Sequence, residues 1–317
     1  MRSTRRLQPK RGVFLIICLL MAFCIFHKST KNVKKERAIL YARLHTIDDA
    51  NCGVGNHVFE VLSLIGIAKM LNRKPMMSPK VFHHFQSDHA ELVNAMSAVD
   101  VLEHPPTIEV PFAHDCCHFA DPINVFEEYA GISVRTKLKY AQLDHSVAQF
   151  AEHYLVDPDL LQGHNLCLHI RRGDFMKDDY LLPSNEKFVV AAIAFLSKKI
   201  KSNSQIIVFG GDTWIDSVLG GKFPYTKIGS FVNAKYPPTA EWRFSQVHCD
   251  TVLLTASAST FGWWIGYFSR GQSVYFNKDH DKGTSPNEYK EVEYFPQQWT
   301  ALKLEANGTI YDAKRDL

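Results

Sequence analysis

The folded part of the chain lacks an excess of positive charge. The whole sequence of 317 residues has a formal net charge of +3, but residues 1–40 contain 10 of its 36 Lys and Arg and only 1 of its 33 Asp and Glu. The remaining residues carry 26 basic and 32 acidic side chains, a net charge of −6. Because a protein that coats nucleic-acid phosphates needs a basic face, this balance argues against nucleic-acid binding.

The sequence also lacks an apolar run long enough to cross a typical bilayer as an untilted helix. Its longest run, residues 13–26, has 14 residues, which at about 1.5 Å per residue extend about 21 Å against a hydrocarbon core of ~30 Å. Flanking lysines and a thin early-secretory bilayer can close this gap. No small-x-small cleavage site follows the run, so we expect an uncleaved signal anchor, with a cleavable signal peptide as the alternative.

The segments on either side of this run are basic and polar. We expect residues 1–12 to form a cytoplasmic tail and residues 27–37, which have no hydrophobic period, to form a stem. An isolated glycosylation sequon, Asn307-Gly308-Thr309, near the C-terminus is consistent with a luminal location.

The cysteine spacing lacks the pattern of a zinc site. The adjacent pair Cys116 and Cys117 does not have the C-x2-C spacing of a zinc knuckle, and no second half follows. Two of the seven cysteines lie in the apolar run, and the remaining five cannot all pair. One or two disulfides fit an oxidising lumen, but spacing does not assign partners, and Cys167 and Cys249 are also explained as small buried core residues.

Two adjacent arginines follow a predicted strand in the second half of the chain. Residues 166–170 alternate in the period of a strand, and Gly173 then allows a sharp turn. Arg171 and Arg172 therefore lie at the carboxyl end of the strand, where parallel α/β sheets hold phosphorylated ligands. Two guanidinium groups can bind a diphosphate without a metal. Surface ion pairing is the alternative explanation.

A glycine-containing loop joins a predicted strand to a predicted helix nearer the N-terminus. Residues 38–44 are typical of a strand, and apolar residues recur at helical spacing in residues 57–71. Gly53, Gly55 and Asn56 lie between them. A helix N-terminus preceded by glycines can bind a phosphate or a sugar hydroxyl, although G-x-G is also common in structural turns.

Strands and helices alternate regularly after residue 165. We expect strands at 166–170, 205–209, 251–255 and 273–276, and helices at 186–201, from Asp212 as N-cap, and at 261–268. This alternation predicts an α/β fold with a parallel sheet. The length predicts two domains of roughly 120 to 150 residues each.

Four motifs resemble those of glycosyltransferase family 11, in the order in which that family has them. Residues 169–174 (HIRRGD) have the H-x-R-R-x-D pattern of α-1,2- and α-1,6-fucosyltransferases, and residues 255–275 resemble the second family signature. Residues 53–57 are similar to the family's G-x-G-N-Q loop, and residues 208–214 to its V-F-S-N-D-x-x-W segment. Together they span residues 53–275 and are strongly specific. The divergent nematode members are the most similar in character.

The resemblance implies an α/β, GT-B-like fold with two facing Rossmann-like domains behind an N-terminal membrane anchor. Residues 38–160 would form the acceptor-side domain, and residues 161–317 the GDP-fucose-binding domain. It implies an inverting transferase that moves L-fucose from GDP-fucose to a galactoside hydroxyl in α-1,2 linkage on a galactose-terminated glycan, with no metal or other cofactor. It also implies a single-pass type II Golgi membrane protein with a luminal catalytic domain.

The resemblance and the chemistry of the residues together select the candidate site. Arg171 and Arg172 would bind the donor diphosphate, and Asp174 would orient an arginine or bind the donor. Ser259 and Thr260, at a helix start, can donate hydrogen bonds to phosphate oxygens. The expected donor-binding residues are His169, Gly53, Gly55, Asn56, Asp212, Ser259, Thr260 and Phe261.

Departures from the family pattern leave the acceptor and the general base open. His57 replaces the usual Gln, Gly211 an Asn, and Ser259 a Gly, and these changes put the acceptor in doubt. Asp212, His57 and Glu60 are equal candidates for the base that accepts the proton of the incoming hydroxyl.

Other functions remain open. The pairs Asp157/Asp159 and Asp279/Asp281 have the Asp-x-Asp spacing of metal-dependent transferases, but turns explain them better. Trp214 could stack on a sugar ring. A catalytically silent luminal carbohydrate-binding protein and a protein O-fucosyltransferase are the alternative functions.

Overall fold

The computed structural model describes a seven-stranded sheet, a three-stranded sheet and a two-stranded pair, together with their helices. The N-terminal segments predicted from sequence lie outside its described residues. The predicted tail, apolar run and stem therefore stay predictions, as does the domain boundary at residue 160. In the part of the chain that is described, no helix is long and apolar enough to cross a membrane. The structure describes residues 39–41, 44, 47, 53–70, 72–90, 92, 99–103, 113–115, 118–119, 163–200, 204–210, 213–228, 237–282 and 291–314.

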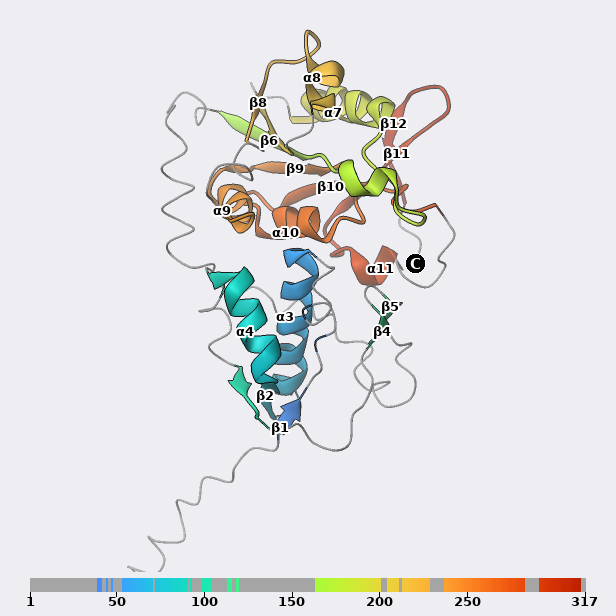
Figure 1. Cartoon of the computed structure of the whole chain (residues 1–317). Helices are drawn as coiled ribbons and strands as arrows, with labels where there is room; N and C mark the ends of the chain where they lie inside the picture. Colours follow the sequence, from blue (N-terminus) through green and yellow to red (C-terminus); the bar gives the residue numbers. More distant parts are fainter. Residues whose placement is uncertain are drawn as a thin grey trace, which may run out of the picture. The chain divides into compact units, whose positions relative to one another are not determined.

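A seven-stranded sheet forms the larger part of the described structure (Figure 1). Its strands lie in the order β12-β11-β10-β9-β6-β7-β8, and all neighbours are parallel except β11 and β12. The six strands β6 to β11 therefore have the 3-2-1-4-5-6 order of a Rossmann sheet. The strands are β6 (His164–His169), β7 (Ser204–Phe209), β8 (Tyr225–Lys227), β9 (Thr251–Leu254), β10 (Ser273–Asn277), β11 (Thr300–Leu304) and β12 (Ile310–Asp312).

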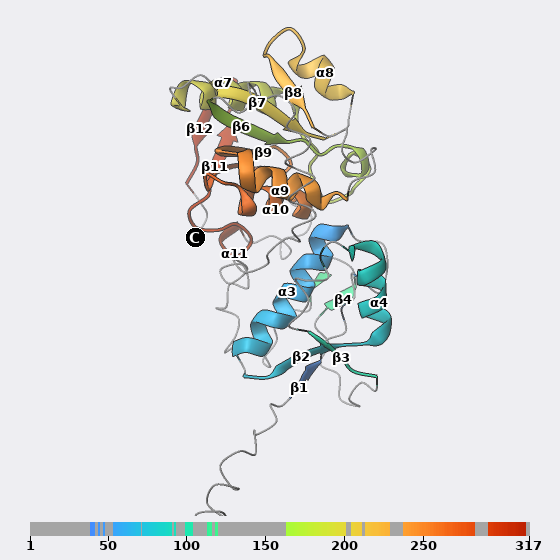
Figure 2. The ribbon, with the colours of Figure 1, turned by 90° about the vertical axis from the view of Figure 1, so that its left-hand side faces the viewer.

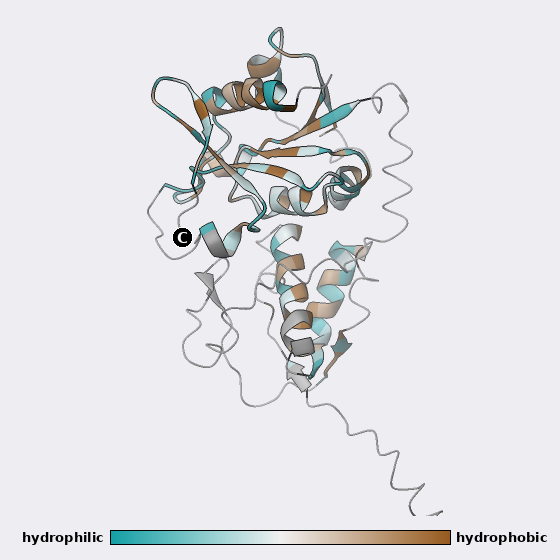
Figure 3. Ribbon diagram, turned by 180° about the vertical axis from the view of Figure 1, so that it is seen from behind, coloured by the Kyte–Doolittle hydropathy of each residue, from teal (hydrophilic) through white to brown (hydrophobic). Residues whose placement is uncertain are grey.

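Helices cover both faces of this sheet, with α7 and α8 on one side and α9 and α10 on the other (Figure 2). Successive side chains of β6 point to opposite faces of the sheet. Leu166 and Leu168 therefore pack with α7 on one face, whereas Cys167 packs with α9 and α10 on the other. Figure 3 shows the apolar segments along α7 and the strands. The helices are α7 (Glu186–Ile200), α8 (Trp214–Leu219), α9 (Thr239–His248), α10 (Thr260–Phe268) and the short α11 (Glu291–Tyr294).

A smaller set of elements precedes this sheet in the sequence. Three short parallel strands pair in the order β1-β2-β3, accompanied by two helices. Ser78 begins the second helix because its hydroxyl accepts a hydrogen bond from Val81 N at 3.2 Å. The elements are β1 (Ile39–Tyr41), α3 (Val54–Met70), β2 (Lys74–Met77), α4 (Pro79–Asp88) and β3 (Asp100–Val101), followed by the pair β4 (Ala113–Asp115) and β5 (His118–Phe119).

The predicted α/β fold with a parallel sheet is confirmed, and two helix starts differ from the sequence prediction. Helix α3 begins at Val54 rather than His57, because the carbonyl of Gly53 accepts from Asn56 N at 2.9 Å and from His57 N at 3.4 Å. Helix α8 begins at Trp214, with Thr213 rather than Asp212 in the N-cap position and without a side-chain capping bond. Asp212 itself lies outside the described residues.

Candidate active site

The candidate site lies at the carboxyl ends of β6 and β9, which are neighbours at the centre of the sheet. His169 at the end of β6 is in register with Leu254 at the end of β9. In this strand order the connections after these two strands leave in opposite directions, and α/β proteins bind ligands at such a point. The predicted position of the arginine pair at a strand's carboxyl end is confirmed.

A chain of buried hydrogen bonds joins the two strand ends and the arginine loop. The backbone N–H of Arg171 donates to Ser184 Oγ at 2.9 Å, and Ser184 Oγ lies 2.6 Å from Thr255 Oγ1. The Thr255 hydroxyl in turn donates to the carbonyl of His169 at 2.7 Å. Ser184 N also donates to the Arg171 carbonyl at 2.8 Å. The start of the arginine loop is thus linked both to the residue that follows β9 and to the segment before α7.

The two arginine side chains are held in different ways. Arg172 Nη1 donates to the Ser184 carbonyl at 3.0 Å, and its guanidinium carbon lies 4.3 Å from the centre of the Trp214 ring. Arg171 Nη2 lies 2.7 Å from Asp174 Oδ2, in a pair whose side chains are 43% and 62% exposed. Trp214 therefore packs against an arginine, and Asp174 is placed to orient one.

His169 is a neutral, buried side chain in this site. Burial, together with the charge of Arg171, lowers the pKa of the His169 imidazole to about 3. Among the described residues Nδ1 has no hydrogen-bond partner. The ring packs so tightly on the backbone of Gly262 that a Cβ at that position would collide with it. His169 can therefore form hydrogen bonds to a ligand only as an uncharged group.

The N-terminus of α10 brings the other predicted donor-binding residues to the same edge. Ser259 Oγ accepts a hydrogen bond from Gly262 N at 3.4 Å, so this hydroxyl caps the helix. A hydroxyl that accepts one hydrogen bond can still donate another. Phe261 lies beside His169, with ring centroids 6.1 Å apart. The geometry therefore leaves the Ser259 hydroxyl able to donate a hydrogen bond.

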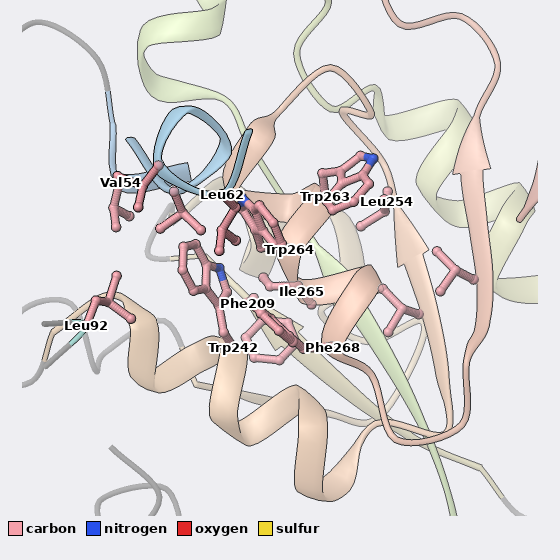
Figure 4. Packing of buried hydrophobic residues seen from close by; sticks show 14 of the residues in the cluster. Val54, Leu62, Leu92, Phe209, Trp242, Leu254, Trp263, Trp264, Ile265 and Phe268 are labelled. Carbon is pink, nitrogen blue, oxygen red and sulfur yellow. The ribbon is translucent and has the colours of Figure 1, made fainter. Parts of the chain in front are cut away.

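Gly55 meets the N-terminus of α10 from the first turn of α3. A Cβ at Gly55 would lie 2.7 Å from Thr260 Oγ1 and 2.8 Å from Phe261 N, so only glycine allows this approach. The indole Nε1 of Trp264 donates to the Gly55 carbonyl at 3.0 Å. Figure 4 shows Leu62 of α3 beside Trp264, and Val54 belongs to the same apolar cluster.

The remaining predicted residues with described positions lie on α3 or just before it. Gly53 is exposed, and a Cβ there would have no heavy atom within 4 Å. Asn56 is half-buried in the first turn of α3. The candidate bases His57 and Glu60 are 4% and 2% exposed, and His57 Nδ1 lies 2.9 Å from His89 Nε2. Burial makes both poor candidates for contact with an acceptor hydroxyl.

The structure adds groups that sequence reasoning missed. Glu241, in the first turn of α9, is 2% exposed, and burial raises the pKa of its carboxyl to about 8. Cys167 of β6 and Cys249, the residue after α9, form a buried disulfide across 82 residues. The spacing of the cysteines did not indicate that these two pair. Ser184 lies in none of the four sequence motifs.

The metal alternative finds no support in the described part of the chain. No group of three or more His, Cys, Asp and Glu side chains there is arranged to bind a metal ion. Asp279 and Asp281 do follow strand β10, but Asp279 Oδ1 pairs with Lys303 at 3.7 Å and Asp281 forms a β-bridge with Leu181. Asp157 and Asp159 lie outside the described residues.

The sheet has the strand order of a doubly wound α/β protein, and the two arginines lie at its topological switch point, between β6 and β9, where such proteins bind their ligands. The profile of glycosyl transferase family 11 matches residues 142–303. The Caenorhabditis elegans protein svh-11, whose name proposes a galactoside 2-alpha-L-fucosyltransferase, is 30% identical over 284 residues, 79% of this chain and 76% of that protein. A galactoside 2-alpha-L-fucosyltransferase from the same organism is 28% identical, with 90% and 85% of the two chains covered.

One solved structure, a NodZ α-1,6-fucosyltransferase soaked with GDP-fucose, is 11% identical with a TM-score of 0.43, covering 88% of this chain and all of that one. This likeness is too low to define a common fold. The family profile and the nematode relatives are sufficient by themselves: the chain belongs to glycosyl transferase family 11 and is a glycosyltransferase. The resemblance seen in the four motifs is confirmed.

Proposed function

We propose that this chain transfers L-fucose from GDP-fucose to a hydroxyl of a terminal galactoside, with inversion, to form an α-1,2 linkage. Family membership and the names of the nematode relatives support fucosyl transfer. The observation that carries the proposal is the pair Arg171 and Arg172 at the switch point of the sheet, held by Ser184, Trp214 and Asp174.

The chemical role of this pair follows from the charge that develops in the reaction. Cleavage of the bond between fucose and GDP leaves negative charge on the diphosphate, and donors already in place stabilise it without reorganisation. Arg172 is held over Trp214, and Arg171 is oriented by Asp174. The N-terminus of α10, with Ser259 and Thr260, adds oriented donors for phosphate oxygens. No metal is part of this proposal.

Three buried side chains are poorly suited to accept the proton of the acceptor hydroxyl. The neutral His169 has a pKa of about 3 and is a weak base, so it fits ligand binding better than proton abstraction. His57 and Glu60 are buried on α3. We therefore assign none of these three residues as the base.

We further propose a type II Golgi membrane protein with its catalytic part in the lumen. The apolar run at residues 13–26 supports an anchor, and the buried disulfide between Cys167 and Cys249 supports an oxidising compartment. Protease treatment of sealed microsomes tests this topology. Digestion of the globular part without detergent, or a mature chain that begins near His27, would contradict it.

The activity is tested by incubating the purified chain with GDP-fucose and a panel of β-galactosides, with hydrolysis and transfer measured separately. We expect a fucosylated galactoside whose linkage is α-1,2 by NMR. Transfer to a Ser or Thr of a folded protein instead would identify a protein O-fucosyltransferase. Glycan binding without turnover of GDP-fucose would identify a silent carbohydrate-binding protein.

A further inference from the structure

We infer that Ser184 and Thr255 are positioning residues for the diphosphate-binding arginines, an inference that rests on the proposed function. Neither side chain belongs to the predicted donor-binding set. Both are almost fully buried, at 1% and 0% exposure, so they act through the groups that they contact. The Ser184 hydroxyl contacts the backbone N–H of Arg171, and the Thr255 hydroxyl contacts the carbonyl of His169.

The direction of each hydrogen bond follows from counting protons. The Thr255 hydroxyl has one proton, which it donates to the His169 carbonyl, so Thr255 Oγ1 must accept the proton of Ser184 Oγ. Ser184 Oγ then accepts from the N–H of Arg171. The series runs in one direction from Arg171 through Ser184 and Thr255 to His169, and each donor in it has an acceptor.

This series closes a ring across the switch point. His169 and Arg171 are its two ends and are separated by one residue, while Ser184 precedes α7 and Thr255 follows β9. Ser184 also accepts from Arg172 Nη1 through its carbonyl and donates its N–H to the Arg171 carbonyl. One residue thus contacts both arginines, and its own position depends on Thr255.

Removal of either hydroxyl should therefore loosen the arginines without removing a group that binds the ligand. Ser184→Ala leaves the Arg171 N–H without its acceptor, and Thr255→Val leaves the Ser184 hydroxyl without its acceptor. An unsatisfied buried donor forces the local backbone to rearrange. A guanidinium group that is thereby displaced from the diphosphate loses charge-assisted hydrogen bonds to it. We expect GDP to bind roughly 10-fold more weakly to each variant.

The chain offers a matched control in Ser257. Its hydroxyl, three residues beyond β9, is also fully buried, and it lies within hydrogen-bond distance of the Asn277 carbonyl at 2.7 Å and the Leu254 carbonyl at 3.2 Å, not of the arginine loop. Ser257→Ala should therefore lower stability by a similar amount and leave GDP binding unchanged. The conservative variants Ser184→Thr and Thr255→Ser keep the hydroxyls and should bind GDP like the wild type.

The test is calorimetric titration of the full chain with GDP, together with KM values for GDP-fucose and for the galactoside acceptor. We expect Ser184→Ala and Thr255→Val to weaken GDP binding and raise KM for the donor, with KM for the acceptor unchanged. Wild-type GDP affinity in both variants, or an equal loss in Ser257→Ala, would refute the positioning role. Absence of GDP binding in the wild type would instead refute the proposed function.

A separate observation leads us to propose that Asn307 is an N-glycosylation site. The sequon Asn307-Gly308-Thr309 forms the exposed turn between β11 and β12, the antiparallel strands at one edge of the sheet. Asn307 Oδ1 accepts from Thr309 N at 2.9 Å, and Gly308 has a φ of 88°, which favours glycine. The acceptor amide thus lies on the surface and not in the core.

The modification joins Asn307 Nδ2 to C1 of an oligosaccharide delivered on a lipid pyrophosphate. The bond between C1 and the pyrophosphate breaks, the lipid pyrophosphate leaves, and the amide loses one proton. The reaction occurs in the lumen of the secretory pathway, where the buried disulfide would also form. No other Asn-x-Ser/Thr sequon occurs in the chain.

The full chain expressed in animal cells provides the test, by its electrophoretic mobility before and after peptide N-glycosidase treatment. We expect one glycosidase-sensitive shift that Asn307→Gln and Thr309→Ala abolish and Thr309→Ser retains. An unshifted wild-type chain, or a shift that persists in Asn307→Gln, would overturn the proposal. Neither result depends on fucosyl transfer.

Discussion

The seven-stranded sheet and the smaller elements around α3 use buried polar residues in different ways. At the carboxyl edge of the large sheet, the buried groups of His169, Ser184 and Thr255 are linked to the arginine loop. Around α3, His57 lies against His89 inside the packing of two helices. The first arrangement fixes the backbone of the arginine loop at the edge of the sheet, whereas the second joins α3 to the residue after α4.

The two sheets also differ in the length of their strands, which gives a physical reason why the buried polar residues are used differently. β6 and β7 pair over six residues, and β6 is bonded to a strand on each side, so the ends of the central strands are held rigidly. The strands β1, β2 and β3 have 3, 4 and 2 residues. The family profile matches residues 142–303, which include the central strands but not α3. The α3 region contributes the close approach of Gly55 to α10.

The largest expected effect comes from removing the covalent link inside the large sheet. The double variant Cys167→Ala/Cys249→Ala opens a crosslink between residues 82 positions apart, which should lower the free energy of unfolding by about 4 kcal/mol. Urea unfolding of the purified chain measures the loss. Equal stability of the variant and the oxidised wild type would show that the link contributes little.

Arg172→Lys tests the chemistry at the edge of this sheet. Lysine keeps the positive charge but lacks the planar guanidinium group that lies over the Trp214 ring. We expect a loss of about 2 to 4 kcal/mol in the transition state, or roughly 30- to 1000-fold in kcat/KM.

Two variants serve as comparisons for Arg172→Lys, and circular dichroism confirms that each is folded. Asp174→Asn should have a smaller effect, because Asp174 acts on Arg171. Arg243→Lys, at a half-buried arginine of α9 that bonds the exposed Gln246, should have none. Near-normal transfer by Arg172→Lys, or a deeper defect in Asp174→Asn, would show that these roles are wrong.

Gly55→Ala tests the contact between α3 and α10. The new methyl group would overlap Thr260 and the backbone of Phe261, so we expect a loss of about 1 to 3 kcal/mol in stability and weaker GDP binding. Gly53→Ala is the matched control, because no heavy atom lies within 4 Å of its Cβ. Equal effects of the two substitutions would remove the structural role given to Gly55.

The buried carboxyl of Glu241 in α9 predicts a pH dependence of stability. Its pKa is raised from 4.5 to about 8, so between these values the unfolded chain has released a proton that the folded chain retains. Its contribution to stability therefore falls as pH rises through this window, by on the order of 1 kcal/mol per pH unit. Glu241→Gln removes this slope, so the variant should gain stability over the wild type toward pH 8.

The comparison is made by urea unfolding at several pH values between 5 and 8. The difference between wild type and Glu241→Gln isolates this carboxyl, because His169 and His248, whose pKa values are lowered, contribute an opposite slope in both proteins. Glu186→Gln, at the exposed start of α7, is the control and should leave the slope unchanged. A pH-independent difference between wild type and Glu241→Gln would contradict the raised pKa.

The smallest expected effect is that of metal removal. Transfer should continue in excess EDTA, because the arginine pair rather than a divalent cation is proposed to neutralise the departing GDP. Initial rates with and without EDTA, followed by addition of Mn²⁺, measure this. A rate that falls in EDTA and is restored by Mn²⁺ would contradict this and support a metal bound at one of the Asp-x-Asp pairs.

Much of the large sheet could be predicted from sequence because its signals are local. The strand at β6 follows from its alternation, and the helix start at Ser259 from a capping residue before an apolar run. The arginines could be placed at a strand end for the same reason. The start of α3 was predicted three residues late, because the carbonyl of Gly53 begins the helix without a side-chain signal.

The amino-acid sequence by itself determined the parallel α/β class, the position of Arg171 and Arg172 after a strand, and the family, because periodicity and motif spacing are properties of consecutive residues. Only the tertiary structure decided that Ser184 meets Thr255, that Cys167 pairs with Cys249, and that Glu241 is buried. These facts depend on which strands become neighbours. The order β7-β6-β9 brings residues more than 70 positions apart into contact, and no local pattern encodes that choice.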